Sequence, residues 1–235
     1  RRAGIYLIAC ASLFSVTACA DTPIKAQIET SQAAAQPNSS VMVDPVVIPR
    51  SFADWRADFR VEALAQGIDP QLFDRAFAGV TPDPDVIKAD QSQPEFSRPV
   101  WAYLDSALSS QRVATGQRKL GEQRAQLARI EQRYGVDRHI LAAIWGLESN
   151  FGQNMGNRQV IRSLATLAHE GRRPTFAHDQ LLGAMDILQH RDIEPERMLG
   201  SWAGAMGQTQ FIPTTYNQYA VDFDGDGRRD IWFSA

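Results

Sequence analysis

The chain has 235 residues, of which 44% are hydrophobic, 22% charged and 9% aromatic. These values are close to those of ordinary globular domains, so they exclude a collagen-like chain, a wholly disordered chain and a protein with many membrane spans. The 24 Lys and Arg against 27 Asp and Glu give a formal net charge of -3, which argues against the broad positive field that holds nucleic acid. We therefore expect one or two folded domains and no nucleic-acid partner.

The first 19 residues predict an export signal. Arg1 and Arg2 precede an apolar run over 5–16, which is shorter than the about 20 residues that a membrane-spanning helix needs. The run ends in Val-Thr-Ala-Cys, which resembles a bacterial lipobox and implies that Cys19 is lipidated; an ordinary cleaved signal is the alternative. By the same resemblance, Ala20 favours an anchor on the periplasmic face of the outer membrane of a Gram-negative bacterium.

Residues 20–50 are rich in Ala, Gln, Ser, Thr and Pro and contain no aromatic residue, so we expect a flexible tether there. Helical spacing of apolar residues begins near residue 51. The predicted helices start at Ser51 and Asp69, cover 100–108, 116–134, 137–152, 161–169 and 175–189, and end with a short one after Pro195. The proline-broken stretch 81–99 is predicted as a loop. No strand of useful length is expected before Tyr219, so the fold class is mainly α.

Glu148 is the first candidate for a catalytic residue. The residues three, four and seven positions before it are Trp145, Ile144 and Leu141, so its side chain lies on the apolar face of the helix predicted over 137–152. Partial burial and the negative end of the helix dipole would both raise the pKa of this carboxyl group. A raised pKa suits a general acid near neutral pH. The alternative is a glutamate that extends from a helix end into solvent.

The segment 200–213 reads Gly-Ser-Trp-Ala-Gly-Ala-Met-Gly-Gln-Thr-Gln-Phe-Ile-Pro. Its short side chains would let a ligand approach the backbone closely. Gln208 and Gln210 offer both hydrogen-bond donors and acceptors. Tyr103 and Tyr216 are candidate ligand-facing aromatic residues, although a tyrosine is more often part of a core. Taken alone, the segment is also consistent with a glycine-rich connection between helices.

The stretch 222–233 is spaced like an EF-hand loop. Its acidic residues fall on positions 1, 3, 5 and 9 of such a loop: Asp222, Asp224, Asp226 and Asp230. Gly227 falls where the chain must turn sharply, and Arg228 falls where a backbone carbonyl binds the ion. Phe233 breaks the pattern because a bidentate Glu is expected at its position. We predict a structural Ca²⁺ site, with a solvated Asp-Gly turn as the alternative, and no organic cofactor.

Three ordered motifs together resemble the membrane-bound lytic murein transglycosylase B family of lysozyme-like enzymes. They are Glu-Ser-Asn-Phe-Gly at 148–152, the segment 200–213 and the tail over 216–222. The resemblance covers about 51–235 and implies a mainly α, lysozyme-like α+β fold, in which a helical catalytic domain carries an additional N-terminal helical portion and lacks its C-terminal part. By position in the family motif, Ser201 would hydrogen-bond and orient Glu148. Gln210 and the region of Met206 would line the sugar subsites. Gln208 would bond to hydroxyl and acetamido groups, and Tyr103 and Tyr216 are candidate sugar-facing aromatic residues.

The resemblance also implies an activity on the glycan strands of peptidoglycan. Glu148 would protonate the glycosidic oxygen between N-acetylmuramic acid and N-acetylglucosamine, and the substrate's N-acetyl carbonyl would support the charge at the anomeric carbon. The same residue would then take the proton of the muramic 6-hydroxyl, giving a 1,6-anhydro sugar without consuming water. We expect a monomer anchored to the membrane by its lipid. The alternatives are a muramidase that hydrolyses the same bond, an inactive wall-binding lipoprotein, and a calcium-sensing module.

Overall fold

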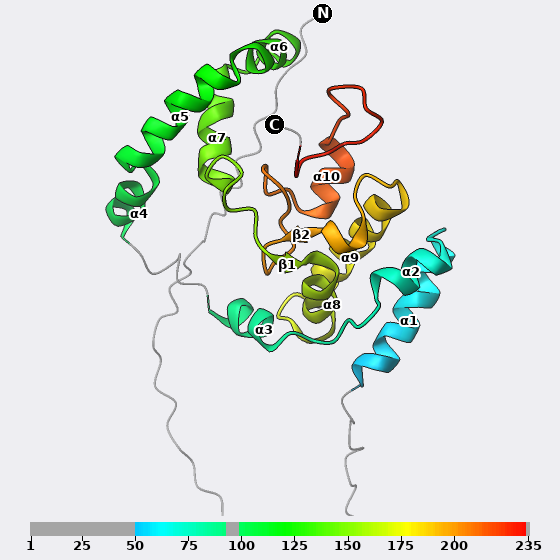
Figure 1. Cartoon of the computed structure of the whole chain (residues 1–235). Coiled ribbons are helices and arrows are strands. Elements are labelled where there is room, and N and C mark those ends of the chain that lie inside the picture. Colours follow the sequence, from blue (N-terminus) through cyan, green and yellow to red (C-terminus); the bar gives the residue numbers. More distant parts are fainter. Residues whose placement is uncertain (1–49, 93–98, 234–235) are drawn as a thin grey trace, which may run out of the picture. The chain divides into compact units, whose positions relative to one another are not determined.

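The computed structural model describes residues 50–92 and 99–233 (Figure 1). The predicted export signal, Cys19 and most of the predicted tether lie outside these described residues. Within the two ranges, no helix is long and apolar enough to cross a membrane.

The described residues form a mainly helical fold, as the sequence predicts (Figure 1). The α-helices are α1 (Phe52–Ala65), α2 (Pro70–Ala76), α3 (Pro84–Gln91), α4 (Val100–Ala107), α5 (Ser110–Glu122), α6 (Arg124–Tyr134), α7 (Arg138–Ser149), α8 (Val160–Glu170), α9 (Pro174–Gln189) and α10 (Pro213–Tyr219). One 3-10 turn, η2 (Pro195–Arg197), lies where a short helix was predicted. Two short strands, β1 (Arg158–Gln159) and β2 (Leu199–Gly200), pair antiparallel. Each is too short to show the alternating pattern of a strand.

Side-chain caps explain why three of the predicted helices begin where they do. The side chains of Ser51, Asp69 and Asp137 each accept a hydrogen bond from a backbone N–H in the first turn of α1, α2 and α7, at 3.1, 2.9 and 2.7 Å. Each bond satisfies an N–H that has no partner within the helix. The predictions for these three starts are confirmed.

The helix α3 lies inside the stretch predicted as a loop, so that prediction was wrong. The Asp83 side chain caps this helix by accepting a hydrogen bond from the N–H of Asp85 at 3.1 Å. Pro84 occupies the first turn, where a proline loses only an N–H that would have had no helical partner. Val86 is fully buried, and α3 packs on α8. This tertiary contact was not visible in a sequence pattern dominated by prolines.

The single helix predicted over 116–134 is two helices, α5 and α6. The chain leaves helical geometry at Gln123, where φ is -101° and ψ is 19°. Gly121 lies just before the break, and glycine lowers the stability of a helix interior. Both α5 and α6 pack on α7. The bend therefore allows two consecutive helices to contact a third, which helical spacing alone could not indicate.

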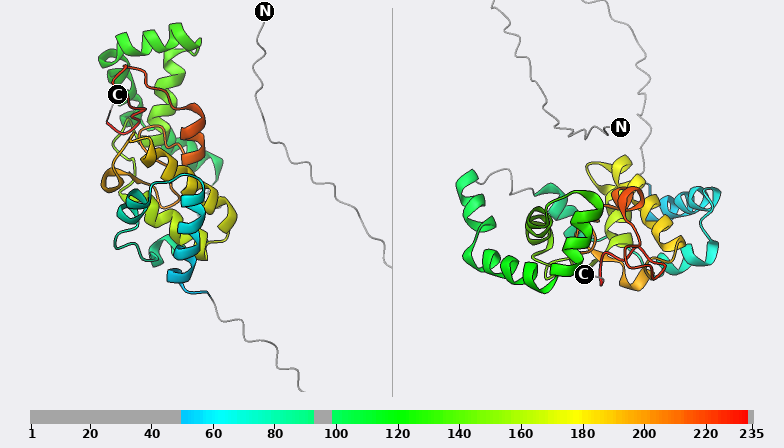
Figure 2. Two further views of the ribbon diagram at one scale, coloured as in Figure 1. Left: turned by 90° about the vertical axis from the view of Figure 1, so that its right-hand side faces the viewer. Right: turned by 90° about the horizontal axis from the view of Figure 1, so that it is seen from above.

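The main hydrophobic core is built around α8 and α9 and includes the N-terminal helices. Its members include Leu164 of α8 and Met185 of α9. Phe59 of α1, Phe73 of α2 and Phe77, which follows α2, belong to the same cluster, with ring centroids 4.4 to 6.0 Å apart. The N-terminal helical portion is thus part of this core. Figures 1 and 2 place α8 and α9 between α1–α2 on one side and α5–α7 on the other.

Candidate active site

Glu148 lies in the last turn of α7, immediately before a sharp change in chain direction. Asn150 and Phe151 follow the helix with φ values of 50° and 59°, in the left-handed region. Asn adopts this conformation more readily than Phe, and such strain is typical of functional sites. The Glu148 side chain is exposed. Within the described ranges it makes no hydrogen bond or ion pair.

The predicted burial of Glu148 was wrong, because α7 packs through another face. Ala142, Gly146 and Ser149 are buried, and they follow one another at spacings of four and three residues. Ile144, on the same face as Glu148, is 51% exposed. Apolar neighbours along a helix therefore do not remove this carboxyl group from water. It is open to solvent, and equally open to a substrate.

Ser149 joins the motif at 148–152 to the segment 200–213. Its fully buried Oγ donates a hydrogen bond to the carbonyl oxygen of Gln208 at 2.7 Å and accepts one from the N–H of Gly152 at 3.0 Å. One turn earlier, Trp145 Nε1 donates to Oε1 of Gln208 at 2.9 Å. The main chain and side chain of Gln208 are thus both bound to the last turn of α7. The apolar spacing around Glu148 gave no signal for this role of Ser149, because Ser149 lies on the buried face of α7 and Glu148 on the exposed one.

Phe151 fills the space beneath this turn. Its ring is buried and meets Trp145 edge-on, with centroids 5.5 Å apart. A Cβ on Gly146 would lie 2.6 Å from the ring, and one on Gly116 would lie 3.1 Å from it. The Phe151 ring therefore fits only because Gly146 of α7 has no side chain, and Gly116 lets the ring lie close to α5. Its burial offsets the cost of its left-handed backbone.

The segment 200–213 folds into a compact loop held by backbone hydrogen bonds. Met206 donates its N–H to the Phe211 carbonyl at 2.8 Å, and Phe211 donates back to Met206 at 3.2 Å. The N–H of Ser201 donates to the Ala205 carbonyl at 2.8 Å. Gly207 has a φ of 65°, and a Cβ there would lie 2.6 Å from the Ile231 carbonyl oxygen. Here the small residues admit another part of the chain rather than leaving open space for a sugar.

Two predicted contacts of the site, that of Ser201 with Glu148 and that of Met206 with sugar, are replaced by internal ones. The Oγ of Ser201 accepts hydrogen bonds from the N–H groups of Ala203 at 3.3 Å and Ala205 at 3.0 Å, and its predicted bond to Glu148 is not formed. The side chain of Met206 is fully buried in the main core, so it does not line a sugar subsite. The physical reason is the tight turn at 200–206, which turns both side chains inward.

Gln210 ties this loop to the chain that follows α7. Its backbone is left-handed, with a φ of 49°. Its Nε2 donates to the carbonyl oxygens of Gly207 at 2.9 Å and Met155 at 3.2 Å. Gln210 thus holds the loop after the Glu148 motif against the segment 200–213, and whether it also contacts a sugar stays a prediction.

A pocket of about 290 Å³ lies next to the contact between Trp145 and Gln208. Apolar side chains of α6 and α7 form much of its wall, including Leu127 and Leu141, and Phe223 of the acidic loop completes it. Gln208 adds a polar group. A mostly apolar concavity with a few converging polar groups is the usual form of a ligand site.

The two candidate tyrosines lie in different environments. Tyr103, on α4, is 57% exposed, and its role in binding sugar stays a prediction. Tyr216 is fully buried, and its Oη donates to the Arg229 carbonyl at 2.6 Å. Burial raises the pKa of the Tyr216 phenol. The prediction that Tyr216 faces sugar was wrong, because its ring belongs to the core and packs against Trp232.

The acidic loop brings three carboxylates together. One oxygen from each of Asp222, Asp224 and Asp226 lies within 4.8 Å of the others. Backbone N–H groups of Gly227, Gly225 and Asp226 donate to the two oxygens of Asp222, at 2.9, 2.7 and 3.2 Å. These bonds, that of Gly227 above all, hold the pKa of Asp222 below its usual range. The group is therefore ionised at neutral pH, and it loses this stabilisation only as the pH falls through the lowered pKa.

The two remaining residues of the predicted metal set are placed differently. Oδ1 of Asp230 accepts hydrogen bonds from the N–H groups of Trp232 at 2.7 Å and Phe233 at 3.0 Å. Arg228 donates its own N–H to Oδ1 of Asp226 at 2.9 Å, as the turn of an EF-hand-like loop requires. The three clustered carboxylates fit a hard cation, which prefers oxygen ligands.

The end of the acidic loop is fixed to the rest of the fold. Buried Asp192 accepts hydrogen bonds from the backbone N–H of Arg229 at 3.0 Å and from its Nη2 at 2.6 Å. Two residues later, the Ile231 carbonyl accepts a hydrogen bond from the N–H of Gln208 at 2.8 Å. The loop therefore contacts the same residue that binds the last turn of α7.

The fold is mainly α, Glu148 lies in the last turn of α7, and the next residue, Ser149, is bonded to the segment 200–213. Residues 51–235 match the family described as Transglycosylase SLT domain, and the chain belongs to this family. Membrane-bound lytic murein transglycosylase B of Escherichia coli (strain K12) is 39% identical over 107 residues, which are 45% of this chain and 30% of that protein.

Two solved structures extend the comparison. SltB3 from Pseudomonas aeruginosa, in complex with NAG-anhNAM-pentapeptide, is 65% identical with a TM-score of 0.77, over 79% of this chain and 49% of that one. Escherichia coli Slt35, in complex with calcium, is 29% identical with a TM-score of 0.68, over 76% of this chain and 57% of that one. The lysozyme-like fold expected from the resemblance is confirmed. The chain spans half or less of the length of the first two relatives.

Replacing Ser149 with Ala should destabilise the site. The change removes the hydrogen bonds that the buried Oγ makes to the Gln208 carbonyl and the Gly152 N–H, at a cost of about 1–3 kcal/mol. Urea denaturation measures this as a lower midpoint. Thr209→Ala, an exposed change in the same loop, is the control and should stay within about 0.5 kcal/mol of wild type. Equal stability of Ser149→Ala and Thr209→Ala would contradict the role given to Ser149.

Proposed function

We propose that this chain is a peptidoglycan lytic transglycosylase that cleaves the β-1,4 bond between N-acetylmuramic acid and N-acetylglucosamine. One observation carries the proposal: the Glu148 carboxyl group is open to a substrate, while the next residue, Ser149, is hydrogen-bonded to Gln208 of the segment 200–213. An exposed group on a fixed backbone can be desolvated by the glycan strand itself when that strand binds.

Glu148 would act first as acid and then as base. The protonated carboxyl gives its proton to the glycosidic oxygen as the bond to the anomeric carbon breaks. The substrate's N-acetyl carbonyl oxygen supports the positive charge at that carbon. The carboxylate then accepts the proton of the muramic 6-hydroxyl, whose oxygen bonds to the anomeric carbon. Glu148 returns to its protonated form, and the product ends in a 1,6-anhydro ring.

Three residues are suited to hold the sugar. Gln208 lines the pocket beside α7, together with Trp145, whose indole ring offers an apolar face. Tyr103 is a further candidate, because its ring is exposed. The binding of NAG-anhNAM-pentapeptide by SltB3 supports a substrate that consists of glycan with attached peptide.

Treatment of the products with borohydride tests this function against a muramidase. Hydrolysis leaves a reducing end, which borohydride converts to an alditol, whereas an anhydro end does not react. We expect muropeptides released from purified cell walls to resist reduction. Quantitative alditol formation at muramic acid would instead identify a hydrolase. Binding to walls without any release would indicate an inactive wall-binding protein.

We also propose that the acidic loop binds Ca²⁺ as a structural ion. Asp222, Asp224 and Asp226 supply three carboxylates in one place, and the structure of Slt35 with calcium supports the same ion here. The Arg228 carbonyl and Asp230 are further candidate ligands. The ion would neutralise carboxylate charges that otherwise repel one another. It would also hold the acidic loop, whose Ile231 carbonyl accepts a hydrogen bond from Gln208.

Calcium should therefore raise the melting temperature. At a concentration 100 times the Kd, the stabilisation is about 2.7 kcal/mol, which corresponds to roughly 5–10 °C for a domain of this size. Asp224→Asn removes one of the clustered carboxylates and should abolish most of the increase. Mg²⁺ is the control and should give a smaller one, because it keeps its waters more firmly. An unchanged melting temperature of the wild type in millimolar Ca²⁺ would refute the site.

We propose that residues 1–19 direct the protein to the cell envelope of a Gram-negative bacterium, where Cys19 is lipidated and 20–50 tether the domain 51–235 to the outer membrane. The membrane-bound relative from Escherichia coli supports a membrane location. Labelling of cells with a fatty acid tests the anchor. We expect wild type to incorporate the label and Cys19→Ser to lack it.

A further inference from the structure

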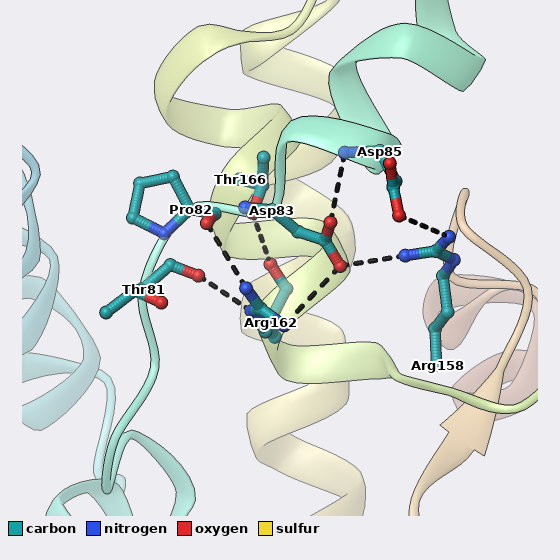
Figure 3. Close-up of polar contacts among 7 residues, drawn as sticks. All are labelled: Thr81, Pro82, Asp83, Asp85, Arg158, Arg162 and Thr166. Carbon is teal, nitrogen blue, oxygen red and sulfur yellow. Dashed lines mark hydrogen bonds and ion pairs between the residues drawn. The ribbon is translucent and has the colours of Figure 1, made fainter.

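A single carboxylate, that of Asp83, connects three parts of the chain (Figure 3). Its side chain is only 12% exposed. It accepts a hydrogen bond from Nη1 of Arg158 at 2.8 Å and forms an ion pair with Nη1 of Arg162 at 3.5 Å. It also caps α3 through the N–H of Asp85. A largely buried carboxylate with two guanidinium partners holds its position strongly, because the loss of those partners would leave its charge poorly solvated.

The backbone of Asp83 is fixed as well. Its N–H donates to the buried Thr166 Oγ1 of α8 at 3.0 Å, and that hydroxyl donates to the Arg162 carbonyl at 2.8 Å. The Arg162 side chain reaches back to the carbonyl oxygens of Thr81 at 2.9 Å and Pro82 at 3.3 Å. Figure 3 shows these bonds on the side of α8 that faces the start of α3. Asp83 is therefore a rigid point of attachment.

Arg158 carries this attachment to the segment 200–213. It lies in β1 and pairs in register with Gly200 of β2, which directly precedes Ser201. On a second path, Trp202 packs against the small hydrophobic cluster that contains Val86 of α3. The strand that enters the segment 200–213 is thus held by the start of α3, and the first aromatic residue of that segment packs on a cluster to which α3 contributes.

We infer that Asp83 is a positioning residue for catalysis, acting through Arg158 and β1 on the segment 200–213. The inferred effect on catalysis rests on the proposed function, whereas the inferred effect of Asp83 on the position of the segment 200–213 does not. Asp83 touches neither Glu148 nor the pocket beside Trp145. It fixes the loop whose Gln208 is bonded to Trp145 and Ser149, so its loss should misplace the loop relative to Glu148 without unfolding the core.

Asp83→Asn isolates the charge, since Asn has the same shape and also caps helices well. On soluble glycan fragments, we expect kcat to fall about tenfold while KM changes less than about twofold, because small misplacements near reacting atoms cost rate. The control is Asp74→Asn, which breaks the exposed pair with Arg60 between α1 and α2. Both constants should stay at the wild-type values in this control.

A double-mutant cycle tests the path through Arg158. Arg158→Gln should lower kcat as Asp83→Asn does, and the double variant should lose about tenfold rather than about a hundredfold, because the two changes share the contact between Asp83 and Arg158. Arg158→Lys keeps the charge and should recover part of the rate. An additive loss, or an unchanged kcat in folded Asp83→Asn, would overturn the inference.

Amide hydrogen exchange tests whether Asp83 holds the segment 200–213 in place, without any measurement of activity. In Asp83→Asn, the N–H groups of Ser201 and Met206, which are bonded inside the loop, should exchange about tenfold faster, while those of α9 should not. Unchanged exchange at both positions would overturn the positioning role. A wild type that makes no anhydro product would refute the proposed function instead, and the exchange result would still stand by itself.

Discussion

Glu148→Gln should abolish the release of anhydro-muropeptides while leaving the fold intact. The amide has nearly the shape of the carboxyl group but can neither donate the proton to the leaving oxygen nor accept that of the 6-hydroxyl. General acid–base catalysis contributes about 10²–10⁴-fold, and a residue that serves both steps should be at the upper end of this range. Because the side chain is exposed, the free energy of unfolding should change by less than about 0.5 kcal/mol. Turnover of purified walls and thermal denaturation measure the two quantities.

Glu170→Gln is the matched control, since Glu170 is also an exposed glutamate in the last turn of a helix, α8. Its activity should equal that of wild type. If Glu148→Gln retained wild-type turnover, the catalytic role of Glu148 would be refuted. If it lost activity together with several kcal/mol of stability, the residue would be structural.

Gly156→Ala should have the largest effect on stability among the substitutions considered. Gly156 has a φ of 84°, and a Cβ there would lie 2.1 Å from the carbonyl atoms of Gly200 and 2.5 Å from the nitrogen of Ser201. The backbones of the two motif-bearing segments meet at this point, so neither can yield without shifting the other. We expect a loss of about 3–5 kcal/mol, from left-handed strain together with overpacking, and a loss of activity in the molecules that remain folded.

The control separates strain from collision. Gly67 has a similar φ of 91°, but a Cβ there would meet nothing within 4 Å. Gly67→Ala should cost only about 1–2 kcal/mol, which is the price of the left-handed conformation alone. Guanidinium denaturation of both variants gives the comparison. Equal losses would mean that the contact between Gly156 and Gly200 adds nothing.

Local signals in the sequence predicted the helices well wherever caps and apolar spacing agreed, as at Asp69 and Asp137. They failed where a distant contact decided the outcome. α3 forms because Val86 is buried and because Asp83 is held by Arg158 and Arg162, and none of these contacts is local. The break at Gln123 likewise depends on how α5 and α6 pack on α7.

The candidate site shows the same division. The sequence identified Glu148, the segment 200–213 and the acidic loop, because each has a characteristic spacing. It did not indicate which side chains turn inward: Ser201 bonds within its own loop rather than to Glu148, and Met206 and Tyr216 are buried in the core rather than facing sugar. Nor did it indicate that Ser149 rather than Glu148 is buried, because both lie on a largely apolar helix.

Digestion of cell walls in water enriched in heavy oxygen tests the central claim, that one carboxyl group closes an internal ring. With no water consumed, the muramic ends should carry no label and should be lighter by one water than the hydrolysed sugar. Mass spectrometry reads both properties from the same fragments. Heavy oxygen incorporated at the anomeric carbon of those ends would contradict the account.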